Sequence, residues 1–243
     1  MSASSHPKPS IPAALWLIRH GESLGNLARA RAESQGLPTI DLQMRDVDVP
    51  LTALGEHQSA ELGKRIFGER PSEEHPTVVL SSPYSRARKT AEIALQALKE
   101  RGESCGIQVD ERLREREFGL FERLTKTGVA EKFPEQAALR AALGKFYYRP
   151  PGGESWCDVI LRLRSMVDTF KRDYAGERIL VVAHHAVIYC FRYLIEELSE
   201  EEILAIDREH ELAHCSLTAY EFAPHPKSGR PQPRLRHFNA LKF

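Results

Sequence analysis

Three short runs of aliphatic and β-branched residues constrain the fold of this chain most strongly. They are Ala14–Ile18, Thr77–Leu80 and Arg178–Ala183, and each is followed by a polar or glycine-containing turn and then by apolar residues at helical spacing. Alternation of this kind predicts βαβ units in which parallel strands are joined by helices. We therefore expect an α/β fold built around a largely parallel sheet.

Further elements follow from periodicity and from capping residues. The pattern predicts three helices, Thr52–Phe67, Ser85–Lys99 and Glu154–Tyr174, of which the first is capped by Thr52. It also predicts two C-terminal strands, Ser216–Phe222 and Leu235–Phe238. In the third helix Ile160, Leu163, Val167 and Phe170 recur every three or four residues, which is typical of a stripe packed into a core.

The length of 243 residues fits one large α/β domain, and we expect a single domain over residues 1–243. Residues 1–13 read as a flexible lead-in. Two stretches, 28–50 and 120–151, show no clear periodicity of hydrophobic residues. We expect both to be insertions over the active-site edge of the sheet, where loops determine specificity.

Charge and composition exclude several classes of protein. Lysine plus arginine equals aspartate plus glutamate at 34 each, so no overall field favours nucleic acid or an anionic membrane as a partner. No apolar stretch approaches the roughly 20 residues that span a bilayer, and the N-terminus lacks the order of a secretory signal. The four cysteines show no CxxC spacing, which indicates buried reduced thiols and a cytoplasmic location.

Cationic and imidazole groups follow all three predicted strands. Arg19 and His20 follow the first strand, Arg86 lies just beyond the second, and His184 ends the third. Ligands of open α/β sheets bind at the carboxyl ends of the strands. Clustering such groups is costly unless an anion joins them, so the sequence predicts an anion site at this edge.

The turn after the first strand suits a phosphate. Gly21 lets the backbone pass close to a ligand, while Ser23 and Asn26 stand at the start of the next helix. The free amides of a helix N-terminus favour a phosphate group. We therefore include Ser23 and Asn26 among the substrate-binding candidates.

The Arg19–Asn26 segment resembles the RHGxSxxN signature of the histidine phosphatase (phosphoglycerate mutase-like) superfamily. Five later segments are similar to motifs of that family in the same order: Leu51–Ala60, Ser81–Ala91, Leu113–Gly119, Pro151–Ser155 and Val181–His184. The resemblance runs from about residue 14 to about residue 222. It implies a three-layer sandwich, with helices on both faces of a mostly parallel central sheet.

The resemblance also implies a division of labour among these residues. His20 would be the nucleophile, forming a phosphohistidine, and Glu115 would be the general acid and then the base. Arg19, Arg86 and His184 would hold the phosphoryl oxygens of a small phosphate monoester. Phosphoryl transfer mainly needs positioning and cations around the equatorial oxygens, so we expect neither a metal nor a cofactor.

The two proton-bearing groups have opposite requirements. His20 must be neutral to attack, and neighbouring guanidinium groups should depress its pKa below about 6.5. Glu115 must be protonated, although a free carboxyl has a pKa of about 4.3. We expect partial burial and the arriving phosphate dianion to raise the pKa of Glu115.

The main alternative is a bisphosphoglycerate-dependent phosphoglycerate mutase, which would return the phosphoryl group to the substrate. Lys126 matches a lysine of the mutase pattern, but Ala141 and Ala142 stand where the mutases carry two arginines, with Arg140 close by. Because two anionic ends on one substrate need dense cationic contacts, this loss favours a phosphatase. A noncatalytic phosphate-binding module is disfavoured because every catalytic position is filled.

The segment His210-Glu211-Leu212-Ala213-His214 formally matches the HExxH motif of zinc metalloproteases. That motif needs a helix, on which residues i and i+4 share a face. Here it runs directly into a predicted strand, so we expect a loop and no zinc site. Adjacent His184 and His185 alternate faces and cannot share a metal either, which leaves His185 at most a role at the rim of the site.

Overall fold

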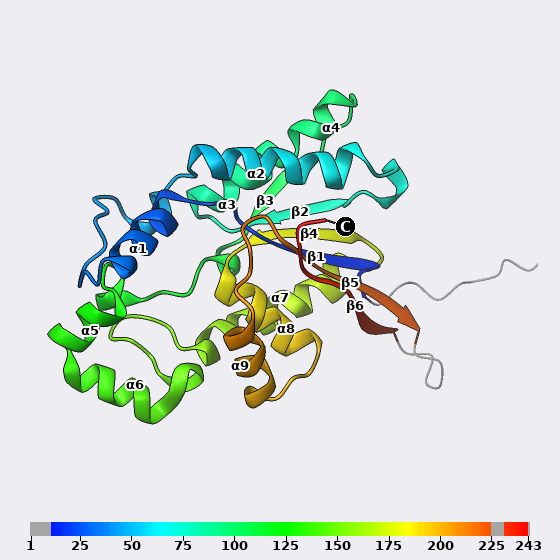
Figure 1. Cartoon of the computed structure of the whole chain (residues 1–243). Coiled ribbons are helices and arrows are strands. Elements are labelled where there is room, and N and C mark those ends of the chain that lie inside the picture. Colours follow the sequence, from blue (N-terminus) through cyan, green and yellow to red (C-terminus); the bar gives the residue numbers. More distant parts are fainter. Residues whose placement is uncertain (1–10, 225–230, 243) are drawn as a thin grey trace, which may run out of the picture.

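The computed structural model describes residues 11–224 and 231–242 and contains a six-stranded sheet in the order β3-β2-β4-β1-β5-β6 (Figure 1). Its strands are β1 Ala14–Arg19, β2 Val78–Ser81, β3 Ile107–Val109, β4 Arg178–Ala183, β5 Leu217–Pro224 and β6 Pro231–Ala240. The first four are parallel, while β5 pairs antiparallel with both β1 and β6. The prediction of an α/β fold with a mostly parallel central sheet is confirmed.

The register of the central strands brings three chain segments to one edge. Arg19 of β1 lies opposite Ala183 of β4, and Ser81 of β2 lies opposite Val182. Backbone hydrogen bonds continue past the strands, since His20 N donates to Ala183 O at 3.0 Å and Ser82 N donates to Val182 O at 3.0 Å. The residues that follow β1, β2 and β4 therefore meet at the carboxyl edge.

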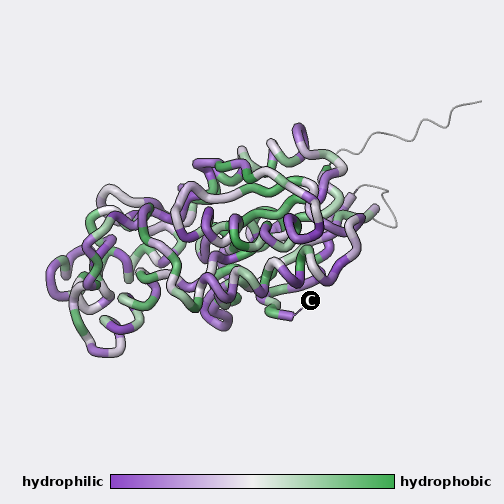
Figure 2. The backbone as a smooth tube through the Cα atoms, turned by 90° about the horizontal axis from the view of Figure 1, so that it is seen from above, coloured by the Kyte–Doolittle hydropathy of each residue, from purple (hydrophilic) through white to green (hydrophobic). Residues whose placement is uncertain are grey.

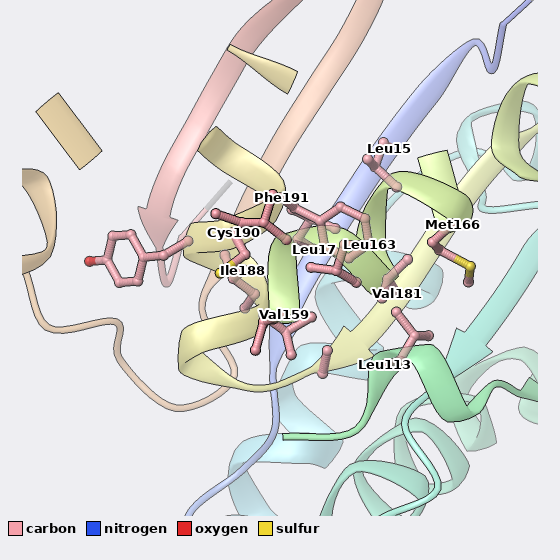
Figure 3. Packing of buried hydrophobic residues seen from close by; sticks show 14 of the residues in the cluster. Leu15, Leu17, Leu113, Val159, Leu163, Met166, Val181, Ile188, Cys190 and Phe191 are labelled. Carbon is pink, nitrogen blue, oxygen red and sulfur yellow. The ribbon is translucent and has the colours of Figure 1, made fainter. Parts of the chain in front are cut away.

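Alternate residues of the buried strands face opposite layers. Leu15 and Leu17 pack with helices α7 (Trp156–Asp173) and α8 (His185–Ile195), as Figure 3 shows. Trp16 and Ile18 pack with α2 (Ala53–Gly63) and α3 (Ser85–Ala94) on the other face. Hydrophobic segments accordingly run through the middle of the molecule in Figure 2. This is the three-layer sandwich, with a core on each side of the sheet.

Helix boundaries follow the capping chemistry. The Thr52 hydroxyl accepts a hydrogen bond from Gly55 N at 3.0 Å, so the predicted cap of α2 is confirmed. This helix continues as a π-helical turn over Lys64–Gly68. The predicted helix Ser85–Lys99 is instead two helices, α3 and α4 (Gln96–Glu100), which meet at Leu95.

The two stretches without clear hydrophobic periodicity contain helices, of which only the one that begins after Ser23 was expected from the sequence. Helix α1 (Leu24–Ser34) extends into the first, and α5 (Lys126–Lys132) and α6 (Pro134–Tyr147) lie in the second. Figure 1 shows all three helices beyond the carboxyl end of β1. The stretches contact each other, because Ile40 N donates to Arg123 O at 2.9 Å.

The ends of the chain and its thiols complete the description. Residues 1–10 of the predicted lead-in lie outside the described residues, while Ile11 O accepts from Gly176 N at 2.8 Å. All four cysteines are free thiols, of which Cys190 and Cys215 are buried and the other two are partly exposed. Across residues 11–224 and 231–242, no helix combines the length and the apolar character needed to cross a membrane.

Candidate active site

His20 lies directly after β1 and is only 3% exposed. Its Nδ1 is 2.7 Å from Gly21 O, and a carbonyl oxygen can only accept a hydrogen bond. Nδ1 therefore carries the proton, and Nε2 keeps a lone pair. That lone pair accepts a hydrogen bond of 3.3 Å from Nε of Arg86.

Burial lowers the pKa of His20 well below its usual value, and the guanidinium groups of Arg86 and Arg19 lower it further. The sequence pointed to the guanidinium groups, but burial is the larger cause. The imidazole is therefore neutral near neutral pH, and its Nε2 is chemically a nucleophile.

Arg19 ends β1 and is also buried. Its Nη1 donates to Leu212 O and lies 3.7 Å from Oε1 of exposed Glu211. Its Nε is buried and has no hydrogen-bond partner among the described residues. A buried guanidinium with an unused donor is suited to receive an oxygen of a bound anion.

Arg86 lies in the first turn of α3 and is 5% exposed. Besides the hydrogen bond to His20, it makes a bidentate ion pair with Asp46, with distances of 2.9 Å and 3.1 Å from Nη1 and Nη2 to the two carboxylate oxygens. Asp46 belongs to a 3₁₀ turn, Asp46–Asp48, in the first of the two stretches. Sequence reasoning did not find this residue, since a single aspartate in an aperiodic loop carries no signal.

His184 directly follows β4 and is fully buried, with its ring centroid 5.1 Å from that of His20. Its Nε2 hydrogen bonds to the Ser82 hydroxyl at 2.7 Å, and its Nδ1 has no partner within the described part of the chain. Burial, and then the charge of Arg86, lowers the pKa of His184 well below the usual value. The second imidazole is therefore neutral as well.

Glu115 lines the same cavity as His20. One carboxylate oxygen accepts a hydrogen bond of 2.8 Å from Arg116 N. Burial raises the pKa of Glu115 above its ordinary value, against the opposing effects of that hydrogen bond and of Arg86, while Asp46 raises it further. A carboxyl with a raised pKa can donate a proton to a leaving group.

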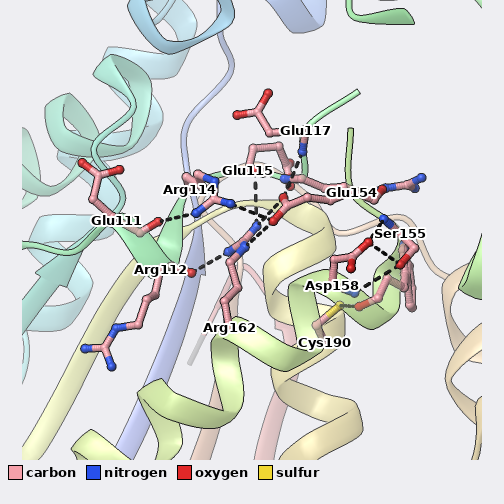
Figure 4. Close-up of polar contacts among 12 residues, drawn as sticks. Glu111, Arg112, Arg114, Glu115, Glu117, Glu154, Ser155, Asp158, Arg162 and Cys190 are labelled. Atoms are coloured by element: carbon pink, nitrogen blue, oxygen red, sulfur yellow. Dashed lines mark hydrogen bonds and ion pairs between the residues drawn. The ribbon is translucent and has the colours of Figure 1, made fainter. Parts of the chain in front are cut away.

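The Glu115 loop is held by charged side chains, as Figure 4 shows. Glu154 accepts hydrogen bonds from Arg114 at 2.8 Å and from Nε of Arg162 at 2.9 Å, and its backbone N donates to Glu117 O at 2.9 Å. Both Glu154 and Arg162 are largely buried. This pair ties the Glu115 loop to α7 and the residue before it.

The turn after His20 is fixed by close backbone packing. A Cβ on Gly21 would lie 2.5 Å from Gly55 O, and one on Gly55 would lie 2.0 Å from Glu22 O. Glu22 N also donates to the side-chain oxygen of Gln58 at 2.9 Å. The start of α2 thus supports the loop that carries the nucleophile candidate.

Ser23 and Asn26 cap α1 reciprocally. Asn26 N donates to the Ser23 hydroxyl at 3.3 Å, and Ser23 N donates to the Asn26 side-chain oxygen at 3.1 Å. The Asn26 side-chain oxygen also accepts a hydrogen bond from the Ser23 hydroxyl. The side-chain NH₂ of Asn26 is therefore the group left to face a ligand.

One cavity of about 120 Å³ joins most of the predicted site residues. Its lining includes six of them: Arg19, His20, Ser23, Asn26, Arg86 and Glu115. The seventh, His184, does not line the cavity but packs edge-on against His20. Eight further lining residues were not singled out as site residues from the sequence: Gly25, Arg29, Ile40, Leu42, Asp46, Phe118, Glu122 and Arg123. His185 also lines the cavity, with its Nε2 3.1 Å from Oδ1 of Asp207.

The HExxH match does not form a metal-binding helix. Helix α9 ends at Glu209, and His210 follows it in extended conformation. His214 instead lies beside the cavity, with its ring 6.1 Å from that of His20, and burial lowers the pKa of His214 to about 4. Among the described residues no group of three or more potential protein ligands could hold a metal.

Two known proteins are similar to this chain in sequence over most of its length. It is 31% identical over 217 residues to "Probable phosphoglycerate mutase GpmB" of Serratia proteamaculans, which covers 87% of this chain and 86% of that protein. It is 27% identical over 231 residues to the phosphoglycerate mutase-like protein AT74H of Arabidopsis thaliana, covering 88% of this chain and 75% of the relative.

Solved structures share its fold. The alpha-ribazole phosphatase of Shigella flexneri superposes with a TM-score of 0.70 at 20% identity, covering 94% of this chain and 97% of that one. The mycobacterial glucosyl-3-phosphoglycerate phosphatase superposes with a TM-score of 0.69 at 23% identity, covering 94% and 99%. The family model of the histidine phosphatase superfamily matches residues 15–228. That match covers the imidazole and guanidinium groups at the carboxyl edge of the sheet, from Arg19 and His20 to His184, and the chain belongs to the histidine phosphatase superfamily (branch 1).

Proposed function

We propose that this protein is a phosphatase that hydrolyses a small phosphate monoester through a phosphohistidine on His20. The observation that carries the proposal is a neutral, buried imidazole whose Nε2 lone pair is directed at the guanidinium of Arg86. The depressed pKa of His20 keeps the nucleophile neutral, and the raised pKa of Glu115 favours the protonated carboxyl that the reaction requires.

The first half of the reaction transfers the phosphoryl group to the protein. Nε2 of His20 attacks phosphorus and forms an N–P bond while the P–O bond to the leaving group breaks. Arg19 and Arg86 hold the equatorial oxygens together with His184, and the NH₂ of Asn26 assists them. Glu115 gives its proton to the leaving oxygen and becomes a carboxylate.

The second half releases phosphate. The Glu115 carboxylate takes a proton from water as the water oxygen bonds to phosphorus, and the N–P bond breaks. His20 returns to its neutral state with Glu115 protonated. The guanidinium groups provide the positive charge, and the neutral imidazole of His184 adds a hydrogen bond, so the proposal includes neither a metal nor a cofactor.

A second candidate function is that of a phosphoglycerate mutase, and one observation favours it. A second cavity of about 140 Å³ adjoins the first, and both are lined by Arg29 and Phe118. Lys126 and Arg140 line this second cavity, and neither is paired with a carboxylate in the described part of the chain. These two cations could hold the second anionic group of a phosphoglycerate. Ala141 and Ala142, which stand where the mutases carry two arginines, argue against a mutase.

A substrate panel tests the proposal. Purified protein is incubated with chemically varied phosphate monoesters, and free phosphate is measured. In parallel, 3-phosphoglycerate is supplied with bisphosphoglycerate, and formation of 2-phosphoglycerate is followed. We expect phosphate release to dominate, with full activity in the presence of chelators. Rapid isomerisation with little phosphate release would establish the mutase instead.

The phosphohistidine is tested separately by rapid acid-free quenching of a reaction with a ³²P-labelled monoester. We expect an acid-labile, base-stable label on the protein and none on His20→Gln.

The remaining parts of the proposal are a cytoplasmic location, which the four free thiols support, and a small-molecule substrate without nucleic-acid or membrane partners.

A further inference from the structure

Arg86 has almost no donor left for a substrate. A guanidinium group carries five N–H donors. Nε donates to His20, Nη1 donates to both the backbone and the side-chain oxygen of Asp46 at 2.7 Å and 2.9 Å, and Nη2 donates to the other carboxylate oxygen at 3.1 Å. Four of the five N–H groups are therefore engaged before any phosphate arrives.

We infer that the Asp46 carboxylate occupies the position of two phosphoryl oxygens on Arg86 and must leave it when substrate binds. A carboxylate and a phosphate present the same pair of acceptor oxygens to the planar fork of an arginine. The inference rests on the proposed function, because it assigns Arg86 the task of holding the transferred phosphoryl group. It makes Asp46 an internal competitor of the substrate.

Neighbouring segments hold Asp46 in this position. Its backbone N donates to Oε1 of Glu122 at 3.0 Å, and Arg123 Nη2 donates to Met44 O at 3.2 Å. Asp46 thus connects the 28–50 stretch to the 120–151 stretch in the lining of the cavity. Displacing its carboxylate breaks the bidentate ion pair but leaves the backbone contact to Glu122 free to persist.

When the Asp46 carboxylate leaves Arg86, the positive charge of that guanidinium becomes available to a bound phosphate. The side chain is about one-third exposed, so water can solvate the carboxylate once it leaves Arg86. The competition therefore weakens phosphate binding without abolishing it. Inorganic phosphate, which is the product, faces the same competitor and should be released more readily because of it.

The test compares two aspartates of the same turn. Asp46→Asn removes the charge with nearly the same shape, and Asp46→Ser is a second neutral variant. Asp48→Asn is the matched control, since Asp48 pairs with Arg45 at 2.9 Å and does not line the cavity. Binding of inorganic phosphate is measured by isothermal titration, and KM and kcat are measured with p-nitrophenyl phosphate.

We expect both Asp46 variants to bind phosphate about threefold to fivefold more tightly, the upper part of the range for exposed ion pairs. KM should fall in the same proportion, and Asp48→Asn should match the parent protein. Unchanged or weaker phosphate binding in both Asp46 variants would overturn the inference and make Asp46 a residue that preorganises Arg86. Titration requires no turnover, so a parent protein that hydrolyses no monoester would refute the proposed function while the titration still decides the role of Asp46.

Discussion

Nε of Arg86 donates a hydrogen bond of 3.3 Å to Nε2 of His20. The atom proposed to attack phosphorus is thus held by a group that also binds phosphoryl oxygens. The contact requires a lone pair on Nε2, because a protonated imidazole has no acceptor. Protonation of His20 would therefore place two positive groups against each other in a buried site, and the structure depends on keeping this histidine neutral.

The first prediction is that stability falls as the pH is lowered below about 6.5. His20 and His184 have a pKa in the folded state well below the usual value, so the unfolded chain binds more protons as the solution is acidified. The free energy of unfolding then rises with pH through the interval between the folded pKa and about 6.5. Each of the two histidines contributes a slope of up to about 1.4 kcal/mol per pH unit there.

Denaturant unfolding across this pH interval checks the prediction. His184→Asn should lower stability at neutral pH and flatten the slope, because one imidazole no longer has to be kept uncharged. His57→Gln, which removes an exposed imidazole on α2, is the control. An identical slope in the parent protein and in His184→Asn would contradict the assignment.

The second prediction concerns the leaving group. His20→Ala should abolish turnover of every substrate, because no other group forms the N–P bond. Glu115→Gln should slow hydrolysis of an alkyl phosphate about 100-fold or more, the usual contribution of general acid catalysis. It should slow hydrolysis of p-nitrophenyl phosphate much less, because that leaving group departs as a stable anion. Steady-state kinetics with both substrates decide it, and equal losses would argue against Glu115 as the proton donor.

The third prediction tests the support beneath the Glu115 loop. Glu154→Gln leaves Arg162, which is largely buried, without its charge partner and weakens the contact with Arg114. Removing one member of a buried ion pair costs about 3 kcal/mol. We expect a loss of this order in the free energy of unfolding, together with a larger fall in kcat for alkyl phosphates than for p-nitrophenyl phosphate.

A surface pair provides the control for this third prediction. Asp173→Asn breaks the exposed contact with Arg172 and should change stability by less than about 0.5 kcal/mol. If Glu154→Gln were equally harmless, or if it slowed both substrates alike, Glu154 would not position the proton donor.

The sequence was sufficient to predict the residues at the carboxyl ends of the strands. It was not sufficient to predict how the 28–50 and 120–151 stretches fold beside them. Buried strands such as β1 and β4 are continuous apolar runs, and their parallel register alone brings His20 and His184 together. Helix α8 lies after β4, where helical spacing was expected, but its bounds were not predicted because residues 186–192 are all buried and show no polar face.

Helices α5 and α6 were missed for the opposite reason. In α6 Leu139 and Leu143 are exposed, so the apolar residues do not mark a buried stripe. Asp46 was missed because its partner Arg86 is 40 positions away and their contact depends on how the 28–50 stretch packs. Local patterns carry no information on such a contact.

The final prediction concerns Gly55, which packs against the turn that follows His20. Gly55→Ala would place a Cβ 2.0 Å from Glu22 O, which belongs to the backbone and cannot move without displacing the turn that carries His20. Overpacking of this kind costs about 1–3 kcal/mol, and we expect a similar loss of stability together with a large fall in kcat. Gly106→Ala is the control, because nothing lies within 4 Å of its added Cβ and it should change neither stability nor activity appreciably. Thermal unfolding and p-nitrophenyl phosphate kinetics measure both effects, and normal kcat in Gly55→Ala would show that the start of α2 does not hold His20 in place.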